Sequence, residues 1–404
     1  MGVLHVWPQA PERREEKIIV SSVLEIPGED RKTLWYSIPE YQEPNLAQNS
    51  DPFVIGAIYL IMQSGHDAHI HGFVSPSLLC NLEDFQSVWT NWRPGLKRVV
   101  IHADHEKEPV DLRQKDESVV AFSGGVDSCF TAFSQAGGYR DNVHQNPSRL
   151  AAGVMVQGFD IPLDQPEVFA SAVTQSQVLL SSIGLELIPI ATNYRELVED
   201  WTHSFGAAAA SCLALFSGRF RAGFISQGLT WSEFHFLHEG SNPLTDPLLS
   251  SDSFRIVPGG TAFKRSEKIY AMREWKEFLQ YLRVCWQGPQ KDRNCCECEK
   301  CMRNILTFRA LGLGLPPCFS KDVDDRLIET IGLGAGHLPE IRYEGLASLA
   351  RANNVQGNWG NILKKRLADI RHFQQTKDSK IWRVYRGVRR RANRVAALLR
   401  STTL

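Results

Sequence analysis

From residue 117 to about residue 226 the sequence alternates short apolar runs with stretches of helical length. The run SVVAF opens the series, and AGVMVQG, LELIPIA and AGFISQG follow, each after a stretch that reads as a helix. This alternation predicts right-handed strand–helix–strand crossovers and a doubly wound parallel sheet with helices on both faces. Ligands bind beyond the carboxyl ends of the strands in such α/β sheets. We therefore expect functional residues at that edge.

The flanking regions have different patterns. In residues 1–115 the runs KIIVSSVLEI, FVIGAIYLIMQ and KRVVIHAD are rich in β-branched and aromatic residues, which predicts a separate β-rich domain. Residues 116–315 form the predicted α/β domain. Within it we expect one long helix over residues 194–217 and another from Ser266 to about Val284. Residues 316–404 begin with two prolines and are predicted to be a helical, basic region.

A serine- and glycine-rich loop lies directly after SVVAF and opens a predicted helix. At such a turn the first helical N–H groups are unpaired and the helix dipole is positive, so an anion is favoured. The two glycines let the backbone close around it, the serines add hydroxyl donors, and the aspartate can cap the helix or hold Mg²⁺. The loop lacks the Gly-Lys-Ser/Thr ending of a Walker loop. We predict a phosphate cradle formed by Ser123, Gly124, Gly125, Val126, Asp127 and Ser128.

Five of the nine cysteines fall between residues 285 and 301, which indicates a metal site. Cys285, Cys295, Cys298 and Cys301 follow a C-x₉-C-x₂-C-x₂-C pattern. Four thiolates at ~2.3 Å can close a tetrahedron around a structural zinc ion. An iron–sulfur cluster is the alternative that such a ligand set leaves open. Cys296 does not fit either C-x₂-C step and is left out of the ligand set.

The loop SGGVDS resembles the signature of the PP-loop ATP pyrophosphatases. That resemblance implies cleavage of ATP, bound with Mg²⁺, between its α and β phosphates, and adenylation of a carbonyl or amide oxygen. Together with the cysteine array, the segment from residue 117 to 315 is similar to the 7-cyano-7-deazaguanine synthase (QueC) family. For that family the resemblance implies adenylation of a 7-deazaguanine carboxylate, amide formation with ammonia, and a second activation that gives the nitrile.

The resemblance also implies site residues. The loop residues and the four cysteines match the family's motifs, and Asp127, Ser128 and Arg265 are the catalytic candidates. Asp160 in QGFDIPL and Glu267, near Arg265 in FKRSEK, match less closely.

Chemistry adds further candidates. A cation near the α-phosphate would oppose the growing negative charge. Lys264, Arg265 and Lys268, at the start of a predicted helix, are candidates for this role, with surface positions as the alternative. Trp231 is a candidate for stacking a purine-like base, with core packing as its alternative. Asp246 is a candidate acceptor for the N–H groups of a guanine-like ring, with loop capping as its alternative.

Departures from the family concern the substrate. Residues 229–251 read LTWSEFHFLHEGSNPLTDPLLSS where the family has a Ser-Gly-Tyr-Pro-Asp-Cys-Arg segment. With its added N- and C-terminal regions, the chain resembles QueC-like proteins of bacterial anti-phage defence systems. This implies attachment of the deazaguanine to a protein acceptor encoded nearby, at its α-amino group, whose pKa near 8 leaves it less protonated than lysine. The alternatives are an ordinary 7-cyano-7-deazaguanine synthase with accessory domains, another amide-forming or tRNA-modifying PP-loop ligase, and a zinc-stabilised binding module.

Charge is unevenly distributed although the chain has 45 Lys and Arg against 45 Asp and Glu residues. Residues 361–404 carry a net charge of +11. Near-helical spacing of Ile381, Val384, Val388, Val395 and Leu399 predicts a basic amphipathic helix. Its charged side is interpreted either as a solvated helix face or as a surface for docking on a partner protein, RNA or an anionic surface. A protein partner is favoured over nucleic acid.

The remaining expectations concern location and one histidine-rich segment. No apolar stretch reaches the ~18 residues of a transmembrane helix, and the first residues lack the order of a secretory signal, so we expect a cytoplasmic protein. In the segment HDAHIHGF, His69 and His71 share a strand face and His66 does not. The pattern favours a polar strand edge over a metal site.

Overall fold

The chain forms two compact units, residues 1–295 with 316–320, and residues 296–315 with 321–404. The structure, a computed structural model, describes residues 2–108, 116–139, 148–234, 238–285, 287–331, 343 and 345–376, with side chains to residue 372. Each unit is described by itself below.

The first unit contains the strands and most of the helices. Its strands are β1 (Leu4–Pro8), β2 (Glu12–Arg14), β3 (Lys17–Glu25), β4 (Lys32–Pro39), β5 (Ala68–Val74), β6 (Ile101–Glu106), β7 (Glu117–Ala121), β8 (Arg149–Gln157), β9 (Glu186–Thr192), β10 (Ala222–Ser226) and β11 (Arg255–Gly259). Its helices are α1 (Asp51–Ser64), α2 (Pro76–Trp92), α3 (Val126–Gln135), α4 (Pro166–Ser181), α5 (Tyr194–Leu197), α6 (Trp201–Ala214), α7 (Arg265–Ala271) and α8 (Lys276–Tyr281), with 3-10 turns η1 (Glu40–Asn45) and η2 (Asp246–Leu249).

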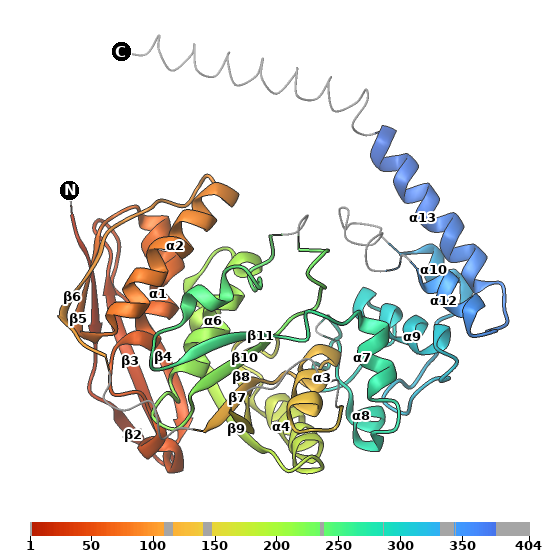
Figure 1. The fold of residues 1–404 in the computed structure, drawn as a ribbon, viewed down its shortest axis with the longest axis horizontal. Helices are drawn as coiled ribbons and strands as arrows, with labels where there is room; N and C mark the ends of the chain where they lie inside the picture. The colour runs from red at the N-terminus through yellow and green to blue at the C-terminus, as the bar shows by residue number, and fades with distance from the viewer. Residues whose placement is uncertain are drawn as a thin grey trace, which may run out of the picture. The chain divides into compact units, whose positions relative to one another are not determined.

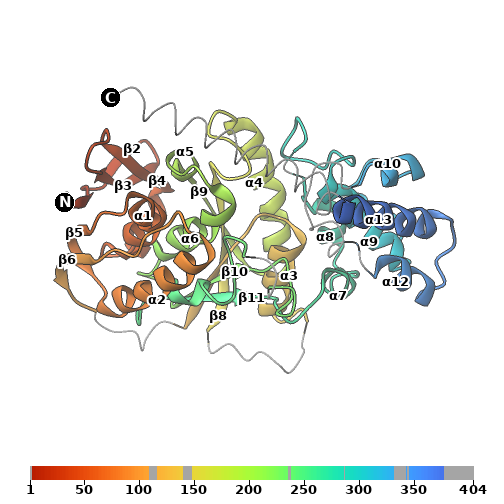
Figure 2. The same cartoon turned by 90° about the horizontal axis from the view of Figure 1, so that it is seen from above.

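All these strands belong to one 11-stranded sheet, in the order β11-β10-β7-β8-β9-β4-β3-β1-β5-β6, with β2 beside β3. The neighbours from β11 to β9 are parallel, as the alternating pattern predicts, and so are β1, β5 and β6. Antiparallel pairs join β9 to β4, β4 to β3 and β3 to β1. Figures 1 and 2 show α1, α2 and α6 on one side of the sheet and α3 and α4 on the other. The predicted mixed α/β fold with a mostly parallel sheet is confirmed.

The N-terminal region continues this sheet and its core. Strand β4 pairs with β9 through Tyr36↔Thr192 and Ser37↔Ala191. Apolar residues from β1, β3, β4, β5, α1 and α2 share one buried cluster with residues of β7 to β11 and α6. The boundary predicted near residue 115 therefore does not separate two sheets or two cores.

The run FVIGAIYLIMQ was expected to be a strand, but it lies in helix α1. Every residue from Asp51 to Met62 is buried, so the run has no polar face whose period would separate helix from strand. The length of the run favours a helix, since strands usually have 3–10 residues. Pro52 fits the first helical turn, and Gly65, with φ +68°, ends the helix in the left-handed conformation.

Two predicted long helices are each divided in the structure. The first becomes α5 and α6, because Asp200 interrupts it and caps α6 by accepting a hydrogen bond from the backbone N–H of His203. The second becomes α7 and α8, which are separated by residues 272–275. No helix was predicted for the residues that form α2.

The second unit is helical in the residues that the structure describes. Its helices are α9 (Glu299–Ala310), α10 (Asp325–Glu329), α12 (Leu346–Ala352) and α13 (Trp359–Thr376). The predicted basic amphipathic helix around Ile381 to Leu399 lies outside the described residues. Among the described helices, none is both long and apolar enough to cross a membrane.

Candidate functional site

The predicted phosphate cradle forms the turn between β7 and α3. Gly124 has φ +73°, a conformation that glycine adopts without the strain of a Cβ atom. The Ser123 hydroxyl is 3.4 Å from the Gly125 N–H that donates to it and 3.3 Å from the Ser128 hydroxyl, which donates to the Gly125 carbonyl at 3.1 Å. Val126 begins α3 and is buried. The strand, loop and helix are therefore arranged as the sequence predicts, with the helix N-terminus opening at the carboxyl end of β7.

Asp127 in the first turn of α3 holds two cations of α7. Its Oδ2 is 2.8 Å from Nη2 of Arg265, and its Oδ1 is 2.9 Å from Nζ of Lys268. Glu267 instead accepts the backbone N–H of Lys264 at 2.7 Å and so caps the helix. The structure thus brings two of the three predicted cations to the loop.

Lys268 is the more deeply placed cation. Its side chain is 1% exposed, and its Nζ also donates to the carbonyl of Gln227, at the end of β10, at 2.5 Å. Burial lowers the pKa of Lys268, and the charge of Asp127 opposes that shift. A Cβ at Gly228 would lie 3.7 Å from both Arg265 Nη2 and Asp127 Oδ2. The ends of β7 and β10 therefore meet the start of α7 at one cationic centre.

Arg283 is a second buried cation, which the sequence did not single out. Its Nη2 donates to the Ser123 carbonyl at 2.7 Å, and its backbone N–H donates to the Gly124 carbonyl at 2.9 Å. Its Nη1 donates to the Lys291 carbonyl at 3.1 Å, while its Nε has no hydrogen-bond partner among the described residues. Burial lowers the pKa of Arg283, and the nearby charge of Asp160 is the largest opposing influence. No local motif could have shown this role, because Arg283 lies some 160 positions after the loop.

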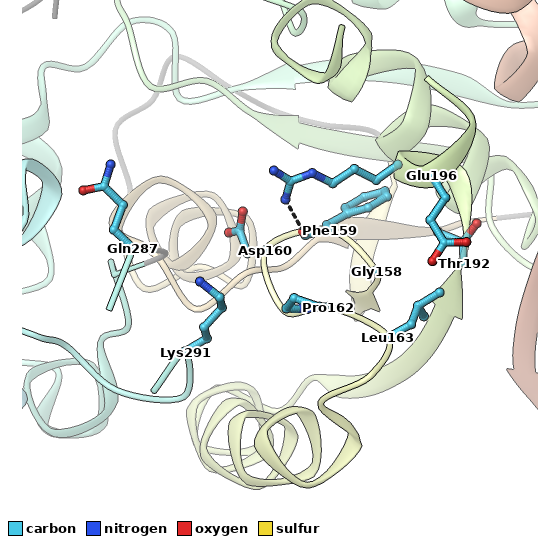
Figure 3. A pocket seen from close by; sticks show the side chains of 10 residues that line it. Gly158, Phe159, Asp160, Pro162, Leu163, Thr192, Glu196, Gln287 and Lys291 are labelled. Atoms are coloured by element: carbon cyan, nitrogen blue, oxygen red, sulfur yellow. Dashed lines mark hydrogen bonds between the residues drawn. The ribbon is translucent and has the colours of Figure 1, made fainter. Parts of the chain in front are cut away.

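A pocket of about 530 Å³ lies beyond the carboxyl ends of β8 and β9 (Figure 3). Asp160, predicted as a substrate residue, lines it, and Figure 3 shows the side chain of Lys291 in the same part of the pocket. Arg195 donates to the Phe159 carbonyl at 2.7 Å. The full lining is Gly158, Phe159, Asp160, Pro162, Leu163, Thr192, Arg195, Glu196, Gln287 and Lys291. The pocket therefore combines apolar walls with several charged groups.

The other two predicted substrate residues differ in exposure. Trp231 follows the loop after β10 and is 53% exposed, so its ring is not part of the core. Asp246 is 1% exposed and accepts hydrogen bonds from Gln227 Nε2 at 2.7 Å, Ser241 Oγ at 2.6 Å and Asn242 N at 3.0 Å. A substrate would have to break these bonds to reach Asp246, so its surroundings fit the alternative role of loop capping.

The four predicted cysteines form a cluster that could hold a metal ion such as zinc. The sulfurs of Cys285, Cys295, Cys298 and Cys301 all lie within 4.8 Å of one another. Thiolates at ~2.3 Å in a tetrahedron lie ~3.8 Å apart, so only a small contraction is needed. Cys285 Sγ also accepts the backbone N–H of Gly288 at 3.2 Å.

Neighbouring residues hold the cysteine segment in place. The side-chain oxygen of Asn294 accepts the N–H groups of Val284 and Cys285, and its Nδ2 donates to the Leu282 carbonyl at 2.7 Å. Cys296 has φ +63°, in the left-handed region that favours glycine. Cys296 therefore stands at a backbone position that glycine would adopt with less strain, between two cysteines of the cluster.

Comparisons with known proteins do not identify the chain. No family model, curated protein or solved structure matches it.

Proposed function

We propose that this protein is an ATP-dependent, AMP-forming enzyme of the PP-loop type that adenylates a 7-deazaguanine. The observation that carries the proposal is the loop Ser123–Ser128 at a helix N-terminus, which is contacted by two buried cations, Lys268 and Arg283. The N–H groups at a helix N-terminus and fixed cations suit a polyphosphate. A pocket with apolar walls and several charged groups, beyond the neighbouring strands, gives a second substrate a place beside it.

The proposed first step joins a carboxylate oxygen of the substrate to the α-phosphorus of ATP, while the bond from that phosphorus to the bridging oxygen breaks and pyrophosphate leaves. Lys268 and Arg265 would oppose the negative charge that grows on the phosphates. Asp127 would keep both cations in position. Mg²⁺ is expected to bind with ATP, and Asp127 would have to give up at least one cation to become its ligand.

The proposed second step is attack of an amine on the acyl carbon, with loss of AMP and of a proton from the nitrogen. Asp160 and Glu196 in the pocket are carboxylates that suit the N–H groups of a guanine-like edge, and Phe159 offers an apolar wall. The acceptor in this proposal is the α-amino group of a partner protein. Ammonia in its place would give the amide, and a second adenylation of the amide oxygen, followed by loss of AMP and of the protons on nitrogen, would give the nitrile of an ordinary 7-cyano-7-deazaguanine synthase.

The first test is product analysis with ATP, Mg²⁺ and 7-carboxy-7-deazaguanine. We expect AMP and pyrophosphate, and ADP with phosphate would contradict the proposal. Lys268→Met should reduce AMP formation by about 100-fold or more, because it removes a fixed charge but keeps the buried volume. Lys276→Met, at the exposed start of α8, is the matched control and should keep full activity.

A second measurement separates the acceptors. Mass spectrometry of a co-expressed neighbouring protein, with and without this chain, should show a deazaguanine mass on its N-terminus. Release of free nitrile from ammonia without any protein adduct would support the ordinary synthase. AMP formation that depends on added tRNA would support a tRNA-modifying ligase.

A further inference from the structure

One face of the sheet at β1, β5 and β6 gathers histidines from three neighbouring strands. Leu4, Val6, Ala68 and Ile70 point into the core and are fully buried. Because side chains alternate along a strand, their neighbours point to the opposite face. In the parallel register His5 lies beside His69, and His69 lies beside His102. This face is remote in sequence from the loop and the cysteines discussed above.

Asp104 on β6 contacts two histidines of β5 on this face, His69 and His71. Its Oδ1 is 2.6 Å from Nε2 of His69, and its Oδ2 is 3.4 Å from Nδ1 of His71. One ligand atom from each of the three residues lies within 4.8 Å of the other two. The sequence shows His69 and His71 two positions apart, but it cannot show that a carboxylate from another strand completes the set.

The surrounding residues fix each of these groups. The register of β5 and β6 shifts between Ile70 and Phe73, and Gly72 in that irregularity has φ +125° and donates its N–H to Asp104 Oδ2 at 3.1 Å. Irregularities of this kind re-aim side chains next to functional sites. The structure therefore holds Asp104 toward the histidines through the backbone.

His71 is fixed on two sides. The indole of Trp7 stacks on its ring with centroids 3.3 Å apart and planes 5° from parallel. Its Nε2 is 3.0 Å from Nδ1 of His5, which leaves Nδ1 directed toward Asp104. A metal-binding histidine usually has its second ring nitrogen held in this way.

We propose that His69, His71 and Asp104 form a second metal site, which takes a divalent transition ion such as Zn²⁺. Two imidazoles and one carboxylate are borderline nitrogen and oxygen ligands that suit this class of ion and leave coordination positions open. The three side chains are 34%, 21% and 38% exposed, so an ion can reach them from solvent and keep a water or an outside ligand. His5 is a positioning residue in this proposal.

The test is zinc content of the full chain after equilibrium dialysis against micromolar Zn²⁺. We expect two ions per chain in the wild type, one at the cysteines and one at this site. His71→Ala and Asp104→Asn should each retain one ion. His66→Ala, which removes a nearby histidine outside the set, is the matched control and should retain two.

Cobalt substitution assigns each ion to its ligands. Thiolates give intense charge-transfer bands with Co²⁺ that imidazole and carboxylate ligands lack, so the bands of the cysteine site should be unchanged in His71→Ala while the second equivalent is lost. His5→Ala should weaken the second equivalent by about 10- to 100-fold. One equivalent in the wild type, two in both ligand variants, or an equal loss in His66→Ala would each overturn the proposal in favour of a hydrogen-bonded surface cluster.

Discussion

At the scale of single residues, Asp127 and Asp246 occupy opposite electrostatic surroundings. Asp127 faces two cations, so its negative charge is compensated. Asp246 is surrounded by neutral donors from Gln227, Ser241 and Asn242. Burial raises the pKa of Asp246 to about 7, and the three hydrogen bonds only partly oppose the shift. A neutral donor stabilises a buried carboxylate less than a full positive charge does.

This difference predicts a pH-dependent stability. Because the pKa of Asp246 is higher in the folded than in the unfolded protein, the folded state binds the proton more tightly. The free energy of unfolding should therefore fall as pH rises from about 4 to about 7, by up to about 4 kcal/mol. Asp246→Asn should remove this part of the pH dependence, as measured by urea unfolding across that range.

The control for this measurement is Asp252→Asn, which changes an exposed aspartate in the same segment. It should leave the pH profile of the wild type unchanged. Identical profiles for the wild type and Asp246→Asn would show that the carboxyl group does not titrate in this way.

The sequence could reveal the site residues that lie in local motifs, but not those whose partners are far away in the sequence. The loop and the cysteines are local motifs, and their spacing is enough to predict that they come together. Arg283 and Asp104 act through partners far away in sequence, and neither lies in a motif. Lys268 was one of three candidate cations in the sequence, and its burial distinguishes it from Arg265, which also contacts Asp127.

At the scale of elements, the parallel strands were predictable because each is a short apolar run between helical stretches. Helix α1 was not, because a run that is buried on all sides has no periodicity. Its burial comes from packing against α6, which begins some 135 positions later. Local sequence could not supply that contact.

The cysteine segment and the start of α9 give a prediction at this scale. Cys298 is the N-cap residue of α9 and Cys301 lies in its first turn, so a bound ion would tie the helix to the preceding segment. Cys298→Ser should abolish binding of about one zinc ion and reduce solubility. The reason is that a structural zinc ion contributes roughly 10 kcal/mol or more to the free energy of folding in small zinc-binding domains. Zinc content and thermal unfolding are the measurements.

Cys296→Ser is the control, since Cys296 is not in the cluster of four sulfurs. It should keep the zinc ion. Equal loss of metal in the two variants would contradict the proposed set of four ligands. Iron instead of zinc in elemental analysis would indicate an iron–sulfur cluster.

At the scale of the whole first unit, the junction between β4 and β9 joins the N-terminal region to the parallel strands. Asn193 accepts the N–H of Trp35 and donates to the Thr33 carbonyl at 2.8 Å. Inside, the fully buried hydroxyl of Tyr36 is hydrogen-bonded to Ser211 of α6. Ser211 in turn donates to the Pro52 carbonyl of α1 at 2.7 Å. The hydrogen bonds and the apolar core thus cross the same boundary.

Removing residues 1–115 should therefore unfold the remainder of this unit. The deletion takes away α1 and exposes the face of α6 against which it packs, together with the edge of β9. Each large buried side chain contributes about 1.5–3 kcal/mol, and a folded domain is stable by only about 5–15 kcal/mol in total. The loss of a few such buried side chains is thus enough to unfold the unit. We expect residues 116–404 alone to lack the cooperative thermal transition of the first unit. Deletion of residues 377–404, which takes away none of the described residues, is the comparison and should leave that transition unchanged. A cooperative transition of the 116–404 fragment near that of the full chain would instead support an independent N-terminal domain.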